Sequence, residues 1–236
     1  MIGKKVLIID DDAQLLQLAG LIFKKAGAQT LAASDGPDGL QKMRIYQPDL
    51  IILDVVMPGM DGFEVCRRIR QTSDSAILIL TALNQEMDML NGLDAGADDF
   101  LSKPFNPEIL LARSRTILRR GQHSMLRNPV FRYSDGFLEI DVERRQIRLG
   151  GQLVKLTGVE FRLLTYLARN AGKVLTFDQI LTNVWGNDYR GSIEHVHVFI
   201  SHLRKKLRED TRNPRYIMTL HGIGYIFERP EFGYRP

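Results

Sequence analysis

The stretch VLIIDDD at residues 6–12 joins a run of four aliphatic residues directly to three aspartates. Similar aliphatic runs occupy residues 50–53 and 77–80, and a weaker one occupies residues 30–33. Continuous rather than alternating apolar residues are typical of strands that are buried on both faces. These runs therefore predict a sheet whose two faces are both covered.

Apolar residues at helical spacing separate the predicted strands, in residues 15–23, 63–69 and 110–118. Residues 97–101 add a short candidate for a fifth strand. Strands that alternate with helices form βαβ units, in which the strands run parallel and helices cover the sheet. We therefore predict an α/β fold with a doubly wound, five-stranded parallel sheet.

The side chains that follow the predicted strands are acidic, hydroxylic or cationic, namely Asp10, Asp11, Asp54, Thr81 and Lys103. The carboxyl ends of parallel strands lie along one edge of a sheet, and binding sites form there. We therefore expect these five side chains to converge although they are far apart in the sequence.

Carboxylates that are held close together repel one another unless a cation lies between them. A hard divalent cation with oxygen ligands meets this need, and Mg²⁺ is the cation that we predict. Acids, Mg²⁺, an ammonium group and a hydroxyl group together can stabilise a phosphoryl group on a carboxylate. Helix capping is the alternative role of an aspartate after a strand, and it stays open for Asp12.

The composition of the 236-residue chain, with 44% hydrophobic and 25% charged residues, predicts two globular domains and excludes wholesale disorder. The longest aliphatic runs have four residues, so we predict no membrane-spanning segment. The N-terminal residues lack a secretory pattern, and the single cysteine, Cys66, excludes an internal disulfide. These features predict a protein of the reducing cytoplasm.

The charge of the chain is divided unevenly between its halves. Residues 1–120 hold 14 Lys and Arg against 16 Asp and Glu, a formal charge of −2. Residues 121–236 hold 18 against 12, a formal charge of +6. A basic second half indicates a polyanion as its partner.

Helix signals dominate the middle of the second half. Thr157 and Glu160 have the spacing of a capping box, and the helix that they open stops before Asn170. Thr176 opens another helix, and residues 192–207 predict a third.

Strand signals flank these helices. Residues 136–140 and 146–149 predict short strands, and residues 216–220 and 225–227 predict a hairpin around residues 221–224. We place the first domain at residues 1–120, a linker at residues 121–134 and the second domain at residues 135–236.

The helix predicted for residues 192–207 has one apolar face, made of Ile193, Val196, Ile200, Leu203 and Leu207. We expect the opposite face to hold Glu194, His195, Val198, Ser201, His202, Lys205 and Arg208. Val198 could touch a thymine methyl group from this face. His195 and His197 point to different faces, which favours surface or DNA-facing histidines over a zinc site.

The first half resembles the receiver domain of bacterial two-component response regulators, which have a flavodoxin/CheY-like fold. The matching stretches are VLIIDDD (6–12), IILDVVMPGMDGFEV (51–65), ILILTA (77–82) and GADDFLSKPF (96–105). The resemblance implies that Asp54 is the phosphoacceptor. It also implies that Mg²⁺ is held by Asp10, Asp11, Asp54 and the backbone carbonyl of Val56.

The same resemblance assigns the remaining residues of the site. Lys103 contacts the phosphoryl group, and Thr81 pairs with Phe100 as a switch, although the family usually has tyrosine at the latter position. A cis peptide bond is implied between Lys103 and Pro104. Val56 and Leu83 flank the path of the attacking water, and because both are apolar we expect a long-lived acyl phosphate.

Receivers of this kind form dimers through the face that residues 84–120 supply here. We expect ion pairs of Asp99 with Arg113, Asp98 with Arg120, and Asp94 with Arg115. Leu90, Leu93 and Leu111 match the apolar patch of that face. Met89 and Ile109 occupy two positions that commonly carry a Lys–Glu ion pair in this family. Because both residues of this pair are apolar here, we predict that high salt weakens this dimer less than a dimer held by ion pairs alone.

The second half resembles the winged helix-turn-helix output domain of OmpR/PhoB-class regulators. The matching stretches are residues 156–186, 196–207 and 216–227, with residues 192–208 as the recognition helix and residues 221–224 as the wing tip. The residues that we expect at the DNA are Glu194, His195, Val198, Ser201, His202, Arg204, Lys205 and His221. Phe199, Ser201 and Ile226 depart from the common pattern and remove phosphate or minor-groove contacts.

The two resemblances predict a regulator and not an enzyme. A sensor histidine kinase would phosphorylate Asp54, and the resulting homodimer would bind direct or inverted repeats in double-stranded promoter DNA and contact RNA polymerase. Two alternatives stay open, namely a Mg²⁺-dependent phosphohydrolase with an aspartyl-phosphate intermediate and a DNA-binding protein whose receiver serves only for dimerisation.

Overall fold

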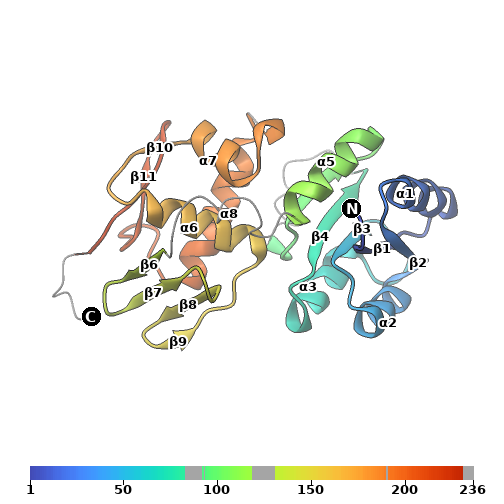
Figure 1. The fold of residues 1–236 in the computed structure, drawn as a ribbon, viewed down its shortest axis with the longest axis horizontal. Helices are drawn as coiled ribbons and strands as arrows, with labels where there is room; N and C mark the ends of the chain where they lie inside the picture. The colour runs from blue at the N-terminus through green and yellow to red at the C-terminus, as the bar shows by residue number, and fades with distance from the viewer. Residues whose placement is uncertain (83–91, 93, 119–130, 190, 231–236) are drawn as a thin grey trace. The chain divides into compact units, whose positions relative to one another are not determined.

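The structure, a computed structural model, describes residues 1–82, 92, 94–118, 131–189 and 191–230. The chain forms two units, residues 1–120 and residues 121–236 (Figure 1). Among the described residues, no helix combines the length and the hydrophobicity that crossing a bilayer requires.

A five-stranded parallel sheet is the centre of the first unit. Its strands are β1 (Lys5–Ile9), β2 (Gln29–Ala33), β3 (Leu50–Asp54), β4 (Ala76–Thr81) and β5 (Asp99–Ser102). Their order in the sheet is β2-β1-β3-β4-β5, which confirms the doubly wound topology. All residues of β3 and β4 are buried, as continuous apolar runs predict. The fifth strand begins two residues later than the sequence pattern indicated.

Helices cover both faces of this sheet (Figure 1). One face carries α1 (Ala13–Lys25) and α5 (Pro107–Leu118), which share a core with alternate residues of the strands. The other face carries α2 (Gly36–Tyr46) and α3 (Gly62–Thr72), which pack against each other. Helix α2 was not predicted from the sequence, because it buries only two large apolar side chains.

Aspartates begin three of these helices. Asp12 accepts hydrogen bonds from the backbone amides of Gln14 and Leu15, at 2.8 and 3.3 Å. Asp35 and Asp61 cap α2 and α3 in the same manner. Capping is therefore the structural role of Asp12, whereas neither Asp10 nor Asp54 caps a helix.

The second unit starts with an antiparallel sheet. Its strands, in spatial order, are β6 (Arg132–Ser134), β7 (Leu138–Asp141), β8 (Gln146–Leu149) and β9 (Gln152–Leu153). The predicted linker is too long at its end, because residues 132–134 pair with β7 and belong to this sheet. Residues 121–130 lie outside the described part of the chain.

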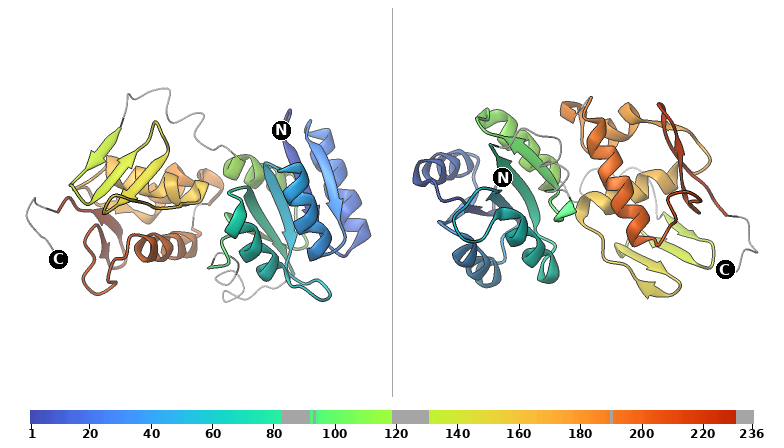
Figure 2. Two further views of the ribbon diagram at one scale, coloured as in Figure 1. Left: turned by 90° about the horizontal axis from the view of Figure 1, so that it is seen from below. Right: turned by 180° about the vertical axis from the view of Figure 1, so that it is seen from behind.

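Helices and a β-hairpin follow the sheet (Figure 2). These elements are α6 (Gly158–Arg169), β10 (Leu175–Thr176), α7 (Phe177–Val184), the short 3-10 helix η1 (Asn187–Tyr189), α8 (Ile193–Lys206), β11 (Ile217–Leu220) and β12 (Gly224–Phe227). Both predicted helix starts are confirmed, since Thr157 and Thr176 each form a complete capping box. Helix α8 packs against α6 and α7, as a winged helix requires.

Candidate functional site

Parallel strands bring four distant segments of the first unit to one edge of the sheet. Asp10 follows β1, Asp54 ends β3, and Thr81 ends β4. In the strand register Asp54 pairs with Leu80, and Thr81 pairs with Ser102 just before Lys103. The backbone amide of Lys103 also donates to the carbonyl of Thr81 at 2.7 Å. The predicted convergence of these residues is therefore confirmed.

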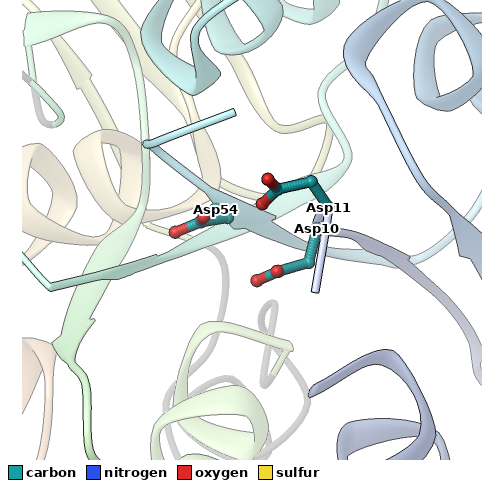
Figure 3. Close-up of side chains that lie close together, drawn as sticks. All are labelled: Asp10, Asp11 and Asp54. Carbon is teal, nitrogen blue, oxygen red and sulfur yellow. The ribbon is translucent and has the colours of Figure 1, made fainter. Parts of the chain in front are cut away.

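Three carboxylates gather at this edge (Figure 3). One oxygen from each of Asp10, Asp11 and Asp54 lies within 4.8 Å of the others. Asp10 and Asp54 are buried, whereas Asp11 is exposed to solvent. Three anionic oxygen donors with one side open to water are consistent with a metal site, and their chemistry suits a hard divalent cation.

Lys103 joins two of these carboxylates. Its Nζ lies 2.8 Å from Oδ2 of Asp10 and 3.0 Å from Oδ1 of Asp54. Burial lowers the pKa of the Lys103 ammonium, but the hydrogen bonds that it donates to Asp10 and Asp54, together with their negative charges, outweigh this effect and raise the pKa above its ordinary value. The amine is therefore held in its charged form beside Asp54.

Asp54 itself lies in a tightly built position. Burial raises the pKa of the Asp54 carboxyl above its ordinary value, and the hydrogen bond from Lys103 opposes that shift. The helix that follows comes so close that a Cβ on Gly62 would lie 2.0 Å from the backbone oxygen of Asp54. Only glycine fits there, and its amide donates to the carbonyl of Val55 at 2.9 Å.

The other residues that the receiver resemblance singles out lie around this pocket. Thr81 and Phe100 are both buried, on neighbouring strands. The side chain of Val56 is exposed, directly after the strand that carries Asp54. The peptide bond between Lys103 and Pro104 is cis, as predicted. Leu83 lies outside the described residues.

The acids that were expected to face a second copy are instead paired within the chain. Asp99 is fully buried and accepts from Arg113 of α5, with Nη1 3.0 Å from Oδ1. Asp98 is also buried and pairs with Arg70 of α3 at 2.8 Å. Both carboxylates therefore brace their own receiver, and the assignment of either one to an exposed dimer face is wrong.

The rest of the expected dimer face is divided. Asp94, Ile109 and Arg115 are exposed, and Leu111 is half-buried. The remaining members, Met89, Leu90, Leu93 and Arg120, lie outside the described residues.

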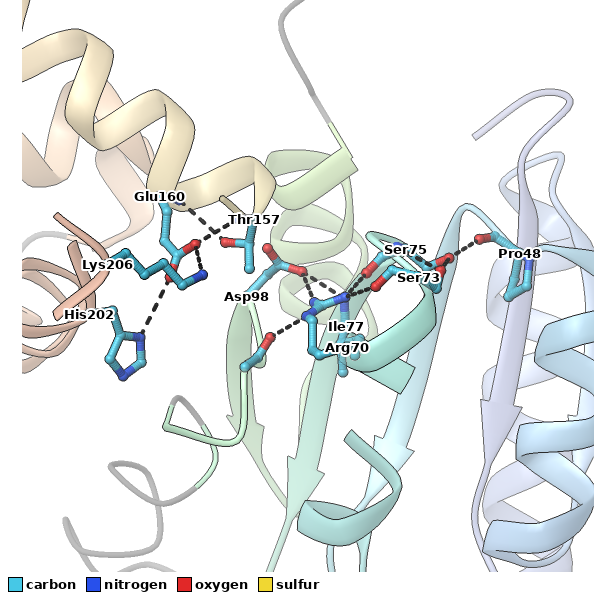
Figure 4. Close-up of polar contacts among 11 residues, drawn as sticks. Pro48, Arg70, Ser73, Ser75, Ile77, Asp98, Thr157, Glu160, His202 and Lys206 are labelled. Atoms are coloured by element: carbon cyan, nitrogen blue, oxygen red, sulfur yellow. Dashed lines mark hydrogen bonds and ion pairs between the residues drawn. The ribbon is translucent and has the colours of Figure 1, made fainter. Parts of the chain in front are cut away.

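Arg70 is the centre of a polar network that sequence reasoning missed (Figure 4). Its guanidinium donates to the carbonyls of Gly96 and Ser75, at 2.7 and 2.6 Å, besides its ion pair with Asp98. Asp98 in turn accepts from the backbone amide of Ile77 at 2.9 Å. An arginine on an amphipathic helix gives no sequence signal that its charge is buried.

Helix α8, which was expected to be the recognition helix, has more buried residues than its sequence indicated. His195 is buried between the rings of Trp185 and Tyr189, and Val198 is buried as well. Arg204 is buried, and its guanidinium donates to the carbonyl of Ile217 at 2.6 Å. These burials contradict the placement of His195, Val198 and Arg204 on the DNA-facing surface.

His202 is also turned away from the exposed face. Its Nδ1 lies 4.0 Å from a carboxylate oxygen of Glu160 on α6, and only 13% of the side chain is exposed. Lys206 reaches the other oxygen of Glu160 at 2.6 Å (Figure 4). Because Glu160 also closes the capping box with Thr157, this cluster ties α8 to the start of α6.

The exposed stripe of α8 consists of Glu194, His197, Ser201 and Lys205, and it continues past the end of the helix to the exposed Arg208, with spacings of three or four residues. Three of its members were among the residues expected at the DNA, and His221 is exposed on the loop between β11 and β12. His197 also belongs to this exposed stripe, although it was not among the residues expected at the DNA. It lies one turn from both Glu194 and Ser201, which is the signal that could have identified it.

Two family models match the chain. The model described as "Response regulator receiver domain" matches residues 6–115, and "Transcriptional regulatory protein, C terminal" matches residues 151–227. Among curated relatives, the alkaline phosphatase synthesis transcriptional regulatory protein PhoP of Bacillus subtilis is 39% identical, over 97% of this chain and 98% of its own length. The DNA-binding response regulator MtrA of Mycolicibacterium smegmatis is 37% identical, over 94% and 96%.

Solved structures that align with nearly the whole chain agree with this match. The response regulator DrrB, described as a Thermotoga maritima OmpR/PhoB homolog, is 34% identical with a TM-score of 0.51, over 97% of this chain and 100% of that one. A mutant of RitR is 29% identical with a TM-score of 0.75 over the same shares. With its acidic pocket and its winged helix, the chain belongs to the OmpR/PhoB-type two-component response regulators, which are DNA-binding transcription regulators and not enzymes.

Proposed function

We propose that a sensor histidine kinase transfers a phosphoryl group to Asp54. The observation that carries this assignment is the contact of Lys103 Nζ with Asp54 Oδ1 at 3.0 Å, beside two further carboxylates. In the transfer a carboxylate oxygen of Asp54 bonds to phosphorus, and the phosphorus–nitrogen bond to the phosphohistidine breaks. The electron pair of that bond stays on the imidazole. The ammonium group of Lys103 stabilises the negative phosphoryl oxygens.

Mg²⁺ is the metal that we propose for the acidic pocket. Asp10, Asp11 and Asp54 would hold it, together with the backbone carbonyl of Val56. The bound cation would neutralise negative charge as the phosphoryl group approaches. Asp10 and Asp54 are each already paired with Lys103, whereas Asp11 faces solvent, so the pocket has an open side for a cation.

Intact-mass measurement after treatment with a small phosphodonor tests the phosphoacceptor. We expect one added phosphate in the presence of Mg²⁺, little in its absence, and none in Asp54→Ala. Asp12→Asn is the matched control, because it changes a neighbouring acid that caps α1 and leaves the pocket acids in place. Equal labelling of Asp54→Ala and wild type would refute the assignment.

We propose that the phosphorylated protein binds repeated sites in double-stranded promoter DNA as a homodimer. The exposed stripe of α8 supports this function, since it presents an acid, a histidine and a serine followed by two cations. Cations of this kind contact phosphates, and the polar groups before them can read base edges. Selection of bound DNA from a random pool, with and without phosphodonor, tests both statements.

The dimer would form through α5 and the segment before β5. Ile109 is the largest exposed apolar side chain in the described part of this face, with 47% of its surface exposed. Leu111, two residues further along α5, is half-buried and packs against the core of the receiver. Asp94 and Arg115 are both exposed and remain the proposed interchain ion pair of the described residues. Thr81 and Phe100 would link phosphorylation to this face, because they lie on β4 and β5 between the two sites.

A further inference from the structure

His197 lies on the exposed stripe of α8, in the first half of the helix. Glu194 lies one turn before it and Ser201 one turn after it, and all three are exposed. An exposed residue in the N-terminal part of a recognition helix is placed to meet a base edge rather than the DNA backbone. His197 differs from its neighbours on the stripe because its ring is fixed by contacts with other elements.

Two aromatic residues hold the imidazole of His197. Its Nδ1 lies 2.8 Å from the hydroxyl oxygen of Tyr225 on β12. The ring of Phe177, the first residue of α7, meets the imidazole edge to face with centroids 5.1 Å apart. The exposed side chain therefore has one orientation, set by the wing strand and by α7.

The position of Tyr225 is itself tightly determined. A Cβ on the preceding residue, Gly224, would lie 1.9 Å from the backbone oxygen of Leu175, so only glycine lets β12 approach β10 this closely. The guanidinium of Arg204 lies 5.7 Å from the centre of the Tyr225 ring. Arg204 is held in turn by the carbonyl of Ile217 and the hydroxyl of Thr219.

The tautomer of His197 sets the direction of its hydrogen bond with Tyr225, and the surroundings of the Tyr225 hydroxyl favour one of the two directions. Burial raises the pKa of the Tyr225 hydroxyl, so it keeps its proton. In the described part of the chain, Nδ1 of His197 is the one hydrogen-bond partner of this hydroxyl. A buried hydroxyl that fails to donate is costly, so Tyr225 donates to Nδ1. In the tautomer that accepts this hydrogen bond, the imidazole carries its proton on Nε2.

We propose that His197 reads a base edge in the major groove and that Tyr225 is its positioning residue. The Nε2–H group acts as a hydrogen-bond donor, so its target is an acceptor atom, such as N7 or O6 of guanine, N7 of adenine or O4 of thymine. Glu194, one turn away, offers only hydrogen-bond acceptors, so it would contact a donor group on a base, whereas His197 would contact an acceptor. This inference rests on the proposed DNA-binding function.

Selection of DNA by the full-length phosphorylated protein tests the reading role. The variants are His197→Phe, which keeps a ring beside Phe177 and removes both nitrogens, and Tyr225→Phe, which removes only the positioning hydroxyl. We expect both to lose preference at the same base pair, by about 2- to 10-fold, as for one hydrogen bond. Tyr216→Phe is the matched control, because its hydroxyl bonds Asp135 at 2.8 Å, away from α8. It should keep the wild-type motif.

The nitrogen-15 spectrum of the His197 ring supplies a readout that lost packing alone would not produce. In the free wild-type protein we expect the Nε2–H tautomer, and in Tyr225→Phe a mixture of both tautomers. An Nδ1–H tautomer in the wild type would overturn the positioning role. A motif that His197→Phe leaves unchanged would overturn the reading role while DNA binding stands. If the wild type selects no motif in either state, the DNA-binding function fails, and the reading role fails with it.

Discussion

The Nζ atom of Lys103 lies 3.0 Å from Oδ1 of Asp54, so an ammonium group after β5 meets a carboxylate at the end of β3 across the intervening strand β4. The same nitrogen contacts Asp10 after β1. One cation therefore neutralises two buried acids from strands that are not its neighbours. Removal of the Lys103 charge should therefore lower the stability of the receiver and make that stability depend more strongly on a bound metal ion.

Lys103→Met should destabilise the metal-free protein by roughly 1–3 kcal/mol, less than the full cost of breaking a buried pair because Lys103 is partly exposed. Added Mg²⁺ should reverse part of the loss, since a bound cation replaces the missing charge. Urea unfolding with EDTA and with Mg²⁺ measures both effects. Lys42→Met, which breaks an i,i+4 pair with Asp38, is the control and should cost at most about 1 kcal/mol. Equal losses in the two variants would contradict the prediction.

Val56→Asn should shorten the lifetime of the phosphorylated state by about 2- to 10-fold, as one added hydrogen bond to an attacking water would. The wild-type side chain is apolar and exposed beside Asp54, so it cannot orient that water. Decay of the added phosphate by mass spectrometry gives the lifetime. Val56→Ala removes bulk without adding a polar group and should leave a long-lived phosphate. A wild-type half-life of seconds would be incompatible with this account.

Asp98→Ala should destabilise the receiver by roughly 3–5 kcal/mol, because Arg70 would stay buried without its counter-charge. Hydrogen exchange of the β4 segment in a urea series reports the unfolding of the receiver separately from that of the second unit. Glu64→Ala removes the partner of Arg67 and Arg68 on the exposed side of α3 and should shift the midpoint far less. A similar shift in both variants would mean that the buried network adds little to stability.

Ile109→Glu should weaken the phosphorylated dimer, because it places a charge where an exposed apolar side chain would be covered. Burying an aliphatic side chain is worth roughly 1.5–3 kcal/mol, so the dimer constant should fall by at least about tenfold. Sedimentation across a salt series measures it, and the wild-type dimer should weaken little as salt rises. Glu108→Ala, one residue earlier on α5, is the control. An unchanged constant for Ile109→Glu would place the interface elsewhere.

Lys205→Ala should weaken DNA binding for all sequences alike. It should also reduce the slope of log affinity against log salt concentration by about the amount that one phosphate contact contributes. The side chain is exposed near the end of the α8 stripe. Lys206→Ala is the control, because that lysine pairs with Glu160 inside the domain. If both variants keep the wild-type salt slope, neither lysine meets a phosphate.

Much of the fold follows from local patterns in the sequence. The aliphatic runs of β1, β3 and β4 predict their own burial, since a parallel strand covered on both faces has no polar side. The pocket was predictable for the same reason, because acids directly after such strands must meet at one edge. The starts of α6 and α7 could be predicted because Thr157 and Thr176 form capping boxes with residues three positions later.

Other features depend on which elements pack against a helix. The sequence periodicity of that helix does not show which elements these are. Helix α8 is covered by α6, by α7 and by Ile217 of β11, so only a narrow stripe remains exposed. His195 and Arg204 look like solvent-facing residues in a sequence, yet aromatic rings and a backbone carbonyl surround them. Asp98 and Asp99 were misplaced for the same reason, since their partners lie on α3 and α5.

The network around Arg70 lies at the amino ends of the strands, opposite the acidic pocket. Ser75, just before β4, donates to the carbonyl of Pro48 just before β3, and Arg70 joins Ser75 to Asp98 just before β5. Three neighbouring strands are thus pinned together at one end of the sheet. A strand that is fixed at one end cannot slide along its neighbours. We therefore expect any displacement that starts at Asp54 to pivot about this end of the sheet and to be largest at the edge that carries the acidic pocket.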